Sequence, residues 1–321
     1  MTILSKLEKN FDLFKIKVKK EIKGKVEFSH SLAKYTSWRV GGDGDIVFWP
    51  DDLADLQKFL AILNYDLVDI PISFLGLGSN VLIRDGGIRG VVIITQGLLN
   101  NLILADEKYI YAEAGVPCAK VSKFMASNGF TKGEFLSGIP GTVGGALAMN
   151  AGAYKGETWD FVAKVQMINK QGQLIFKDSH EFEISYRTVK HKSIEQEWFV
   201  AAWFAFDKGV KEESLARIKN LLKSRNESQP IGKFSGGSVF RNPKDNYAAK
   251  IIETLGLKNY SIGGAQVSEK HANFIINDKT ATAKDIESLI FYVKDMVFKE
   301  YNINLEPEVH FLGDYLYNEQ I

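Results

Sequence analysis

The sequence predicts an α+β protein built from two or three structural units. Its 321 residues are long for a single compact core. Hydrophobic residues make up 45% of the chain and charged residues 25%, the usual balance of a globular protein with a sizeable core. Short apolar stretches typical of strands alternate with stretches whose apolar residues recur at helical spacing, so both kinds of element are expected.

Eight stretches are predicted to be strands because they are rich in Val, Ile, Phe and Tyr and are bounded by Gly, Asp or Asn. They span residues 45–49, 72–75, 90–95, 109–114, 164–169, 173–177, 199–206 and 271–277. Helices are expected over residues 53–63, 120–128, 213–223, 247–255 and 284–301. The last has an apolar stripe that predicts a core face, and Thr282 and Asp285 are spaced to cap its start.

The first residues predict an amphipathic helix docked on the protein, since Ile3, Leu4, Leu7, Phe11 and Phe14 fall near helical spacing. They lack the continuous apolar region of a secretory signal, and no run in the chain reaches the ~18 apolar residues of a membrane span. We therefore expect a cytoplasmic protein without a membrane partner.

Charge and cysteine content argue against several classes of function. The formal net charge is +1, so we expect no nucleic-acid partner, and an anionic ligand must be held by a local cluster of donors. Cys118 is the only cysteine, which excludes intramolecular disulfides and CxxC metal sites. We expect no bound metal, and no obligate protein partner is evident.

A domain boundary is expected at 207–211, where an apolar strand ends in the polar run DKGVK. It would divide the chain into an N-terminal region of residues 1–208, with lobes of about 28–95 and 96–208, and a C-terminal α/β domain of residues 209–321.

Two glycine-rich segments are candidates for a cofactor site. The first is Gly76–Asn80 (GLGSN), which follows a predicted strand, and the second is Ser137–Tyr154 (SGIPGTVGGALAMNAGAY). Glycine lets backbone N–H groups approach an anion closely. The first segment alone is also explained by a tight turn. We interpret the second as a long loop with a ligand lying against it. Neither fits G-x-G-x-x-G or a P-loop, so the residues indicate a phosphate-bearing cofactor without identifying it.

Both segments resemble the cofactor loops of the UDP-N-acetylenolpyruvoylglucosamine reductase (MurB) family, and YTSWRVGG at 35–42 resembles a further motif of that family. The resemblance implies an FAD-binding domain of the vanillyl-alcohol-oxidase/PCMH type in two lobes, followed by a C-terminal α/β substrate-binding domain. It implies FAD contacts from Gly76, Gly78, Ser79, Asn80, Ser137, Gly138, Pro140, Gly141, Gly145, Asn150, Ala151 and Gly152.

Three further segments extend the resemblance over residues 33 to 313: SYR at 185–187, GGSVFRNP at 236–243 and LEPEV at 305–309. The run IGGAQVSEKHANF at 262–274 is also similar to the family. Taken alone, Arg187 reads as an ion-paired surface residue, Ser238 as a turn serine and Glu308 as a solvent-facing residue. The resemblance makes Arg187, Ser238 and Glu308 the expected catalytic residues.

The implied reaction is the NADPH-dependent reduction of UDP-N-acetylglucosamine enolpyruvate through FAD. Hydride reaches C3 of the enolpyruvyl ether, and negative charge develops at C2. A guanidinium suits such spread charge, so Arg187 is expected to stabilise it. Ser238 is expected to give the proton to C2 as general acid. Glu308 helps only if it is protonated or orients Arg187. The alternative is another flavin-dependent oxidoreductase on the same scaffold.

The chain departs from the family at several positions. Val189 stands where Tyr-Arg-x-Ser has serine, which puts the support of Arg187 in doubt, and Lys155 replaces a common glycine. The connector 207–214 contains no tyrosine, so the chain resembles the branch without a tyrosine-bearing loop insertion. Arg225, Lys233, Arg241 and His271 are candidates for substrate contacts, although each is equally explained as a structural or surface residue.

Overall fold

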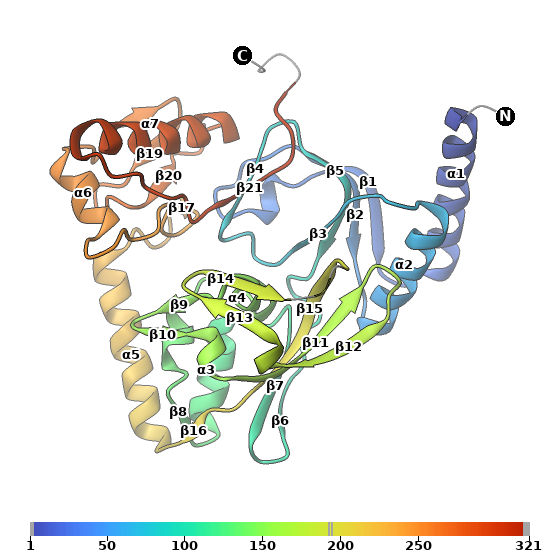
Figure 1. Ribbon diagram of the computed structural model, residues 1–321, viewed down its shortest axis with the longest axis horizontal. Coiled ribbons are helices and arrows are strands. Elements are labelled where there is room, and N and C mark those ends of the chain that lie inside the picture. The colour runs from blue at the N-terminus through green and yellow to red at the C-terminus, as the bar shows by residue number, and fades with distance from the viewer. Residues whose placement is uncertain (1–2, 192, 194, 317–321) are drawn as a thin grey trace. The chain divides into compact units, whose positions relative to one another are not determined.

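The computed structural model describes residues 3–191, 193 and 195–316 (Figure 1). The chain forms two compact units and passes between them several times. The first unit comprises residues 1–28, 46–76 and 90–222, and the second comprises residues 29–45, 77–89 and 223–321. Each unit therefore contains segments that are distant in sequence, whereas the sequence suggested two contiguous regions.

The first unit is built around a five-stranded sheet of order β12-β11-β15-β7-β6, in which every neighbouring pair is antiparallel. Helices α3 and α4 lie beside this sheet (Figure 1), and their apolar residues share a core with it. The bounds are β6 Leu102–Ala105, β7 Tyr109–Glu113, β11 Val162–Asn169, β12 Leu174–Asp178, β15 Glu197–Phe204, α3 Cys118–Ser127 and α4 Val143–Met149.

A second sheet has the order β1-β2-β5-β3, with β3 and β5 parallel. Helices α1 and α2 contact each other and contribute to the core on the part of this sheet that belongs to the first unit. Phe59 of α2 stacks on Phe48 with ring centroids 3.9 Å apart, and Phe14 of α1 meets Phe59 edge-on. The bounds are β1 Lys25–Ser31, β2 Asp43–Trp49, β3 Ile72–Leu75, β5 Ile88–Ile94, α1 Ile3–Glu21 and α2 Leu53–Asp66.

The second unit contains an antiparallel sheet of order β17-β20-β19-β18 and a parallel pair β4-β21. Helices α6 and α7 share its core, and the capping box of Thr282 and Asp285 starts α7 as predicted. The bounds are β4 Val81–Ile83, β17 Phe234–Ser235, β18 Ser261–Ile262, β19 Ala265–Val267, β20 Ile275–Asn277, β21 His310–Leu312, α6 Ala248–Thr254 and α7 Ala283–Tyr301.

Short elements complete the fold, and several of them border the candidate site. Helix α5 connects the two units in sequence, since its residues are divided between them. The bounds are α5 Lys211–Ser228, β8 Phe130–Thr131, β9 Gly152–Ala153, β10 Gly156–Glu157, β13 Phe182–Ser185, β14 Thr188–His191, β16 Asp207–Lys208 and the 3-10 helices η1 Ala33–Tyr35, η2 Glu134–Gly138, η3 Thr158–Asp160 and η4 Ser179–Glu181.

Most predicted elements are confirmed, and two expectations are wrong. Residues 271–277 are not one strand: Phe274 donates its N–H to the carbonyl of His271, so a turn precedes β20. Residues 137–154 are not one long loop, because α4 lies within them. Its two glycines disfavour a helix, but Val143, Ala146 and Leu147 are buried in the core, and this tertiary packing overrides the propensity.

The start of α5 accounts for the place of residues 209–222 in the first unit. Ser214 donates its hydroxyl to the carbonyl of Phe130, and Arg217 forms an ion pair with Glu134 at 2.9 Å. These contacts tie the first half of the helix to β8 and η2. The first two residues of the expected polar connector, Asp207 and Lys208, form the short strand β16, which pairs with β8.

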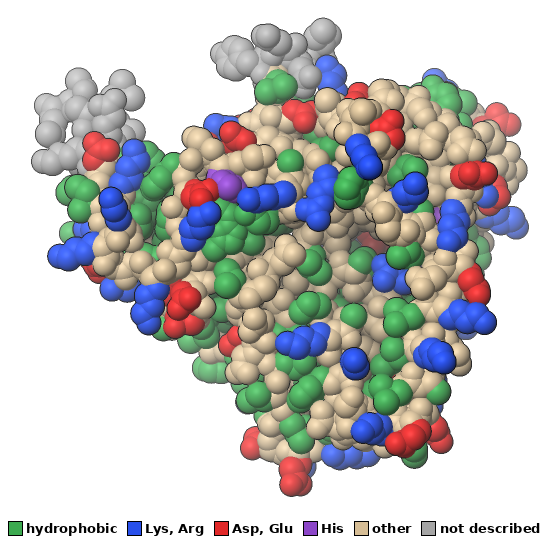
Figure 2. Space-filling view, turned by 180° about the vertical axis from the view of Figure 1, so that it is seen from behind, with side chains coloured by type: hydrophobic (Ala, Val, Ile, Leu, Met, Phe, Trp, Pro, Cys, Tyr) green, Lys and Arg blue, Asp and Glu red, His purple; other side chains and the backbone are tan. Residues whose placement is uncertain are grey.

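The predicted N-terminal amphipathic helix is α1, in which Phe14 is fully buried. The side chains of Ile3, Leu4 and Leu7 lie outside the described residues. Across residues 3–191, 193 and 195–316, no helix is both long and apolar enough to cross a bilayer. On the face shown in Figure 2, Lys and Arg side chains are interspersed with Asp and Glu.

Candidate flavin site

The first glycine-rich segment turns directly after β3 and makes close contacts within each of the two units. In the first unit, a Cβ at Gly76 would collide with the side chain of Thr142, so the two glycine-rich segments meet there. In the second unit, Gly78 has φ +59, and a Cβ there would collide with the carbonyl oxygen of Tyr35. Ser37 donates its N–H to the carbonyl of Gly78 at 3.0 Å. Tyr35 and Ser37 therefore constrain the turn at Gly78.

The second segment is a sequence of turns around α4. Ser137 donates its hydroxyl to the carbonyl of Glu134 at 2.7 Å, and the ring of Tyr154 packs where a Cβ of Gly138 would lie. Asn150 ends α4 in a left-handed conformation, with φ 48, and its side chain is fully buried. Its amide donates to Glu157 at 2.7 Å and accepts from the N–H of Trp159 at 3.1 Å. These bonds hold the end of the segment rigidly.

Two neighbouring glycines of α4 have different surroundings. A Cβ at Gly144 would lie 2.9 Å from the Cβ of Ala114, so this glycine is required for packing against the sheet. A Cβ at Gly145 would have only the hydroxyl of Thr142 nearby, at 3.9 Å, and Gly145 is exposed. Space beside Gly145 is therefore not used by the protein's own packing. That fits a cofactor lying against the segment, as the donor-rich glycine backbone implies.

Arg187 lies in the two-residue turn of the hairpin β13–β14, which the pair Ser185 and Thr188 closes. It has φ 55, a left-handed conformation that costs a non-glycine residue about 1–2 kcal/mol. Its guanidinium donates to the carbonyl of Asn150 at 3.3 Å and to that of Gly152 at 2.9 Å. The structure thus brings Arg187 onto the end of the second segment. Such strain persists only where the surroundings hold it, and it is common at functional sites.

The departure at Val189 does not leave Arg187 unsupported. The guanidinium is held by backbone carbonyls, which need no hydroxyl at position 189. Val189 itself packs against the core of the first unit. A hydrogen bond from the amide of Asn150 to the carbonyl of Ser185, at 3.3 Å, further connects the hairpin to the segment.

In the second unit, Asn80, Ser238 and Glu308 lie on adjoining backbone segments. Glu308 donates its N–H to the carbonyl of Val239 at 2.7 Å, next to Ser238. The side-chain amide of Asn80 donates to the carbonyl of Glu308 at 3.0 Å, and the carbonyl of Asn80 accepts the N–H of His310. The end of GLGSN and two of the three expected catalytic residues are therefore joined within one unit. Glu308 precedes β21 and is not part of a strand.

Asn273 and Trp38 are structural residues of this site that the sequence did not single out. Asn273 is buried and brackets Phe240, accepting its N–H at 2.9 Å and donating to its carbonyl at 2.8 Å. Trp38 is fully buried and donates to the carbonyl of Ile275 at 2.8 Å. A Cβ at Gly236 would collide with the ring of Trp38. Both lie inside motifs that resemble the family, and that position is the sequence signal that could have identified them.

Three of the four candidate substrate-side residues, Arg225, Arg241 and His271, have side-chain partners within the second unit. Arg225 donates to Gln229 at 3.1 Å, and Arg241 forms an ion pair with Glu306 at 3.4 Å. The ring of His271 accepts the N–H of Asn273, and burial lowers its pKa below the ordinary value. In the part of the chain that the structure describes, no group of three or more His, Cys, Asp or Glu residues could hold a metal ion.

Comparisons with known proteins agree with this architecture. Residues 44–176 match a family model described as an FAD binding domain, so the chain has the fold of an FAD-binding protein. Residues 229–312 match the model of the UDP-N-acetylenolpyruvoylglucosamine reductase C-terminal domain. A UDP-N-acetylenolpyruvoylglucosamine reductase of Coxiella burnetii is 49% identical over 91% of this chain and 97% of its own length. The chain belongs to the UDP-N-acetylenolpyruvoylglucosamine reductase family.

Solved structures support the fold assignment. The crystal structure of the reductase MurB from Thermus caldophilus matches with a TM-score of 0.75 and 28% identity, covering 91% of this chain and 100% of that one. 6-Hydroxy-D-nicotine oxidase from Arthrobacter nicotinovorans matches with a TM-score of 0.52 and 11% identity, covering 87% and 86%. The second likeness concerns the fold alone. The expected α+β class, with an FAD-binding domain of the vanillyl-alcohol-oxidase/PCMH type and a C-terminal domain, is confirmed.

Proposed function

We propose that the protein is an FAD-dependent oxidoreductase that reduces UDP-N-acetylglucosamine enolpyruvate to UDP-N-acetylmuramate with NADPH. The observation that carries the proposal is the binding of the Arg187 guanidinium to the carbonyls of Asn150 and Gly152. It joins a permanent cation, suited to stabilising an enolate-like charge, to the end of a glycine-rich segment in an FAD-binding domain. Family membership supports the choice of reaction over another flavin-dependent oxidation.

The cofactor contacts that we propose lie on the two glycine-rich segments. Gly145 offers space that the protein's packing leaves unused, and Gly78 lets its segment turn against residues 35–36. Bound FAD supplies a two-electron relay between NADPH and the substrate. The proposed contacts are Gly76, Gly78, Ser79, Asn80, Ser137, Gly138, Pro140, Gly141, Gly145, Asn150, Ala151 and Gly152.

Three side chains act on the substrate in this proposal. Arg187 stabilises the negative charge that develops at C2 and its carboxylate, since a fixed guanidinium needs no reorganisation as that charge forms. Ser238 donates the proton to C2, which is basic enough to take one from a hydroxyl. Glu308 helps to stabilise the intermediate. Its backbone is held by Val239 and Asn80, which fixes the start of its side chain beside the Ser238 segment.

We also propose which regions of the chain bind the cofactor and the substrate. Residues 1–208, with lobes of about 28–95 and 96–208, form the FAD-binding region, and residues 209–321 form the substrate-binding domain. The two family models at 44–176 and 229–312 support it. The product is a peptidoglycan precursor, so we propose a cytoplasmic role in cell-wall synthesis that contributes to cell shape and division.

The test combines cofactor content with turnover. The purified protein should be yellow and release FAD on denaturation. It should consume NADPH only when UDP-N-acetylglucosamine enolpyruvate is present and form UDP-N-acetylmuramate in equal amount. A colourless protein that takes up no FAD would contradict the cofactor assignment. Flavin that NADPH reduces and oxygen alone rapidly reoxidises, without effect of the substrate, would favour an oxidase instead.

A further inference from the structure

The hairpin β13–β14 depends on tertiary contacts for its position. A two-stranded hairpin alone is at best marginally stable in water, so its two ends must be held. At its turn, Arg187 is bound to the carbonyls of Asn150 and Gly152. At its open end, Phe182 is paired with His191 across the two strands, and their rings pack edge-on with centroids 5.2 Å apart.

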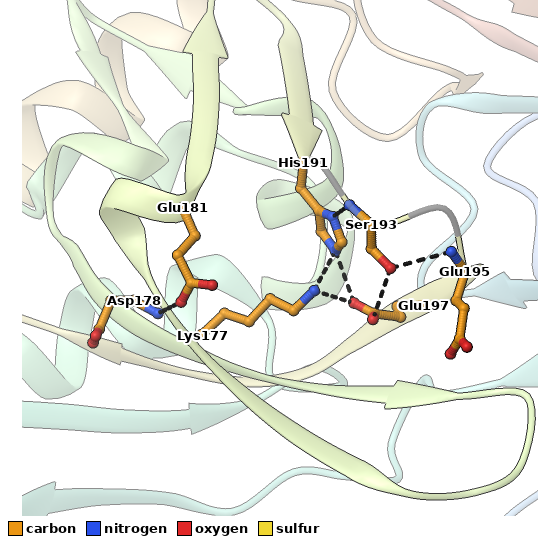
Figure 3. A network of polar contacts seen from close by, with 7 residues as sticks. All are labelled: Lys177, Asp178, Glu181, His191, Ser193, Glu195 and Glu197. Carbon is orange, nitrogen blue, oxygen red and sulfur yellow. Dashed lines mark hydrogen bonds and ion pairs between the residues drawn. The ribbon is translucent and has the colours of Figure 1, made fainter.

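A buried polar cluster of Lys177, His191 and Glu197 holds that open end (Figure 3). The Lys177 ammonium lies 2.6 Å from one oxygen of Glu197, and Nε2 of His191 lies 2.7 Å from the same oxygen. The side chains of Lys177 and His191 are 13% exposed and that of Glu197 is 5% exposed, so water screens the cluster weakly. Charge-assisted hydrogen bonds in such surroundings are strong and directional.

The hydrogen bonds define the arrangement of the cluster. Nδ1 of His191 accepts the N–H of Ser193 at 2.7 Å, and Nε2 lies 2.7 Å from both the Lys177 ammonium and the Glu197 carboxylate. Burial acts to raise the pKa of Glu197, but the hydrogen bonds from Lys177 and His191 outweigh it, and the pKa is lowered. Glu197 is therefore a carboxylate at neutral pH that binds a cation and an imidazole together.

The cluster joins the hairpin to the large sheet of the first unit. Lys177 lies on β12, Glu197 begins β15 and His191 ends β14, so three strands meet at one carboxylate. Arg187 is four residues from His191 along β14, about 13 Å at the rise of a strand. None of the three cluster residues needs to touch the substrate to act on Arg187, because the strand transmits their position to the turn.

We infer that Lys177, His191 and Glu197 are positioning residues for Arg187. They hold the open end of the hairpin on the sheet, so that the strained turn keeps its guanidinium on the carbonyls of Asn150 and Gly152. The inference rests on the proposed function for its catalytic consequence, although the structural consequence is independent of it. A misplacement of about 1 Å at such a group can slow a reaction about 100-fold.

The variants Lys177→Met and Glu197→Gln test the inference with two measurements. Amide hydrogen exchange of a peptide covering 182–191 is followed in the FAD-loaded protein without substrate. Stopped-flow flavin absorbance then separates flavin reduction by NADPH from flavin reoxidation by UDP-N-acetylglucosamine enolpyruvate. We expect faster exchange in the hairpin and substrate reoxidation slowed about 10- to 100-fold, with NADPH reduction unchanged.

The matched control is Lys17→Met, which breaks another ion pair of the first unit that has a buried carboxylate. The Lys17 ammonium lies 2.7 Å from Asp66, whose side chain is 6% exposed, between α1 and α2. This variant should lose stability without changing hairpin exchange or the ratio of the two half-reactions. If Lys177→Met does not fold, the double variant Lys177→Met/Glu197→Leu removes both charges together, which buried ion pairs often tolerate.

The possible results are distinct. Hairpin exchange no faster than in Lys17→Met would overturn the inference, as would an equal loss in both half-reactions. A wild-type protein whose flavin the enolpyruvyl substrate never reoxidises would refute the proposed function. In that case the exchange measurement still decides whether the cluster holds the turn that bears Arg187.

Discussion

Gly144 and Gly145 are adjacent in α4 and permit a separation of packing from cofactor binding. Alanine at either position improves helix propensity and restricts the unfolded chain, which together stabilise by about 0.4–1 kcal/mol where the space is open. At Gly145 the nearest atom to a new Cβ is 3.9 Å away, so Gly145→Ala should stabilise the apoprotein by that amount. The expected rise in melting temperature is about 1–4 °C.

At Gly144 the same substitution would place a Cβ too close to packed core atoms. The new Cβ would lie 2.9 Å from the Cβ of Ala114 and 3.3 Å from its carbonyl oxygen. Overpacking of this kind costs about 1–3 kcal/mol. After the gain of about 0.4–1 kcal/mol is subtracted, Gly144→Ala should destabilise the apoprotein by up to about 2.5 kcal/mol.

The order of the two variants should reverse for FAD affinity: Gly145→Ala, the more stable apoprotein, should bind FAD more weakly than Gly144→Ala. A Cβ at Gly145 enters the space that we assign to FAD, and a steric cost of about 1–3 kcal/mol weakens binding about 10- to 100-fold. The assay is thermal melting of the apoprotein together with titration by FAD, followed by flavin fluorescence. Unchanged FAD affinity in a stable Gly145→Ala protein would refute the placement of the cofactor at this glycine. A melting temperature for Gly144→Ala as high as that of Gly145→Ala would refute the packing argument.

Four further outcomes are expected. Ser238→Ala should keep NADPH reduction of the flavin but slow reoxidation by substrate about 10²–10⁴-fold, whereas equal loss in both would make Ser238 structural. Arg187→Lys should slow the same step about 10²–10³-fold, since an ammonium cannot bind both carbonyls as the guanidinium does; a normal rate would remove Arg187 from the mechanism. Burial raises the pKa of Cys118 to about 12, so a thiol reagent at pH 8 should label it only after unfolding, and rapid native labelling would contradict its burial. The lowered pKa of Glu197 contributes stability that is fully present above pH 4.5 and is lost as pH falls through the folded pKa. Glu197→Gln should therefore flatten the curve of unfolding free energy against pH below pH 4.5. An unchanged slope in acid would argue against the cluster.

The sequence predicted elements that combine a clear apolar pattern with a boundary signal. The strand at residues 72–75 matches β3, and the helix beginning after Thr282 matches α7 with its capping box. In both cases local signals and tertiary packing favour the same structure. The cofactor segments were found for a different reason, because glycine composition reports the need for close backbone approach.

Elements were missed where tertiary packing decides against the local signal. The two glycines of α4 predict a loop, but the burial of Val143, Ala146 and Leu147 stabilises a helix there. The hairpin β13–β14 has no glycine or asparagine in its turn, because Arg187 itself takes the left-handed position. No rule of turn composition anticipates an arginine there.

The expected site residues come from sequence motifs, whereas the contacts that join distant residues cannot be predicted from those motifs. Lys177, His191 and Glu197 are separated by polar stretches that read as surface, and only the fold makes them one buried cluster. Asn80 and Glu308 are 228 positions apart, and a hydrogen bond joins them. Such contacts depend on the register of distant strands, which periodicity in one segment does not determine.

A single anaerobic turnover tests the central claim most directly. The FAD-loaded protein is reduced with one equivalent of NADPH and mixed, without oxygen, with UDP-N-acetylglucosamine enolpyruvate. We predict that oxidised flavin absorbance returns and that UDP-N-acetylmuramate forms in an amount equal to the flavin. Flavin that stays reduced in the presence of this substrate would contradict the account.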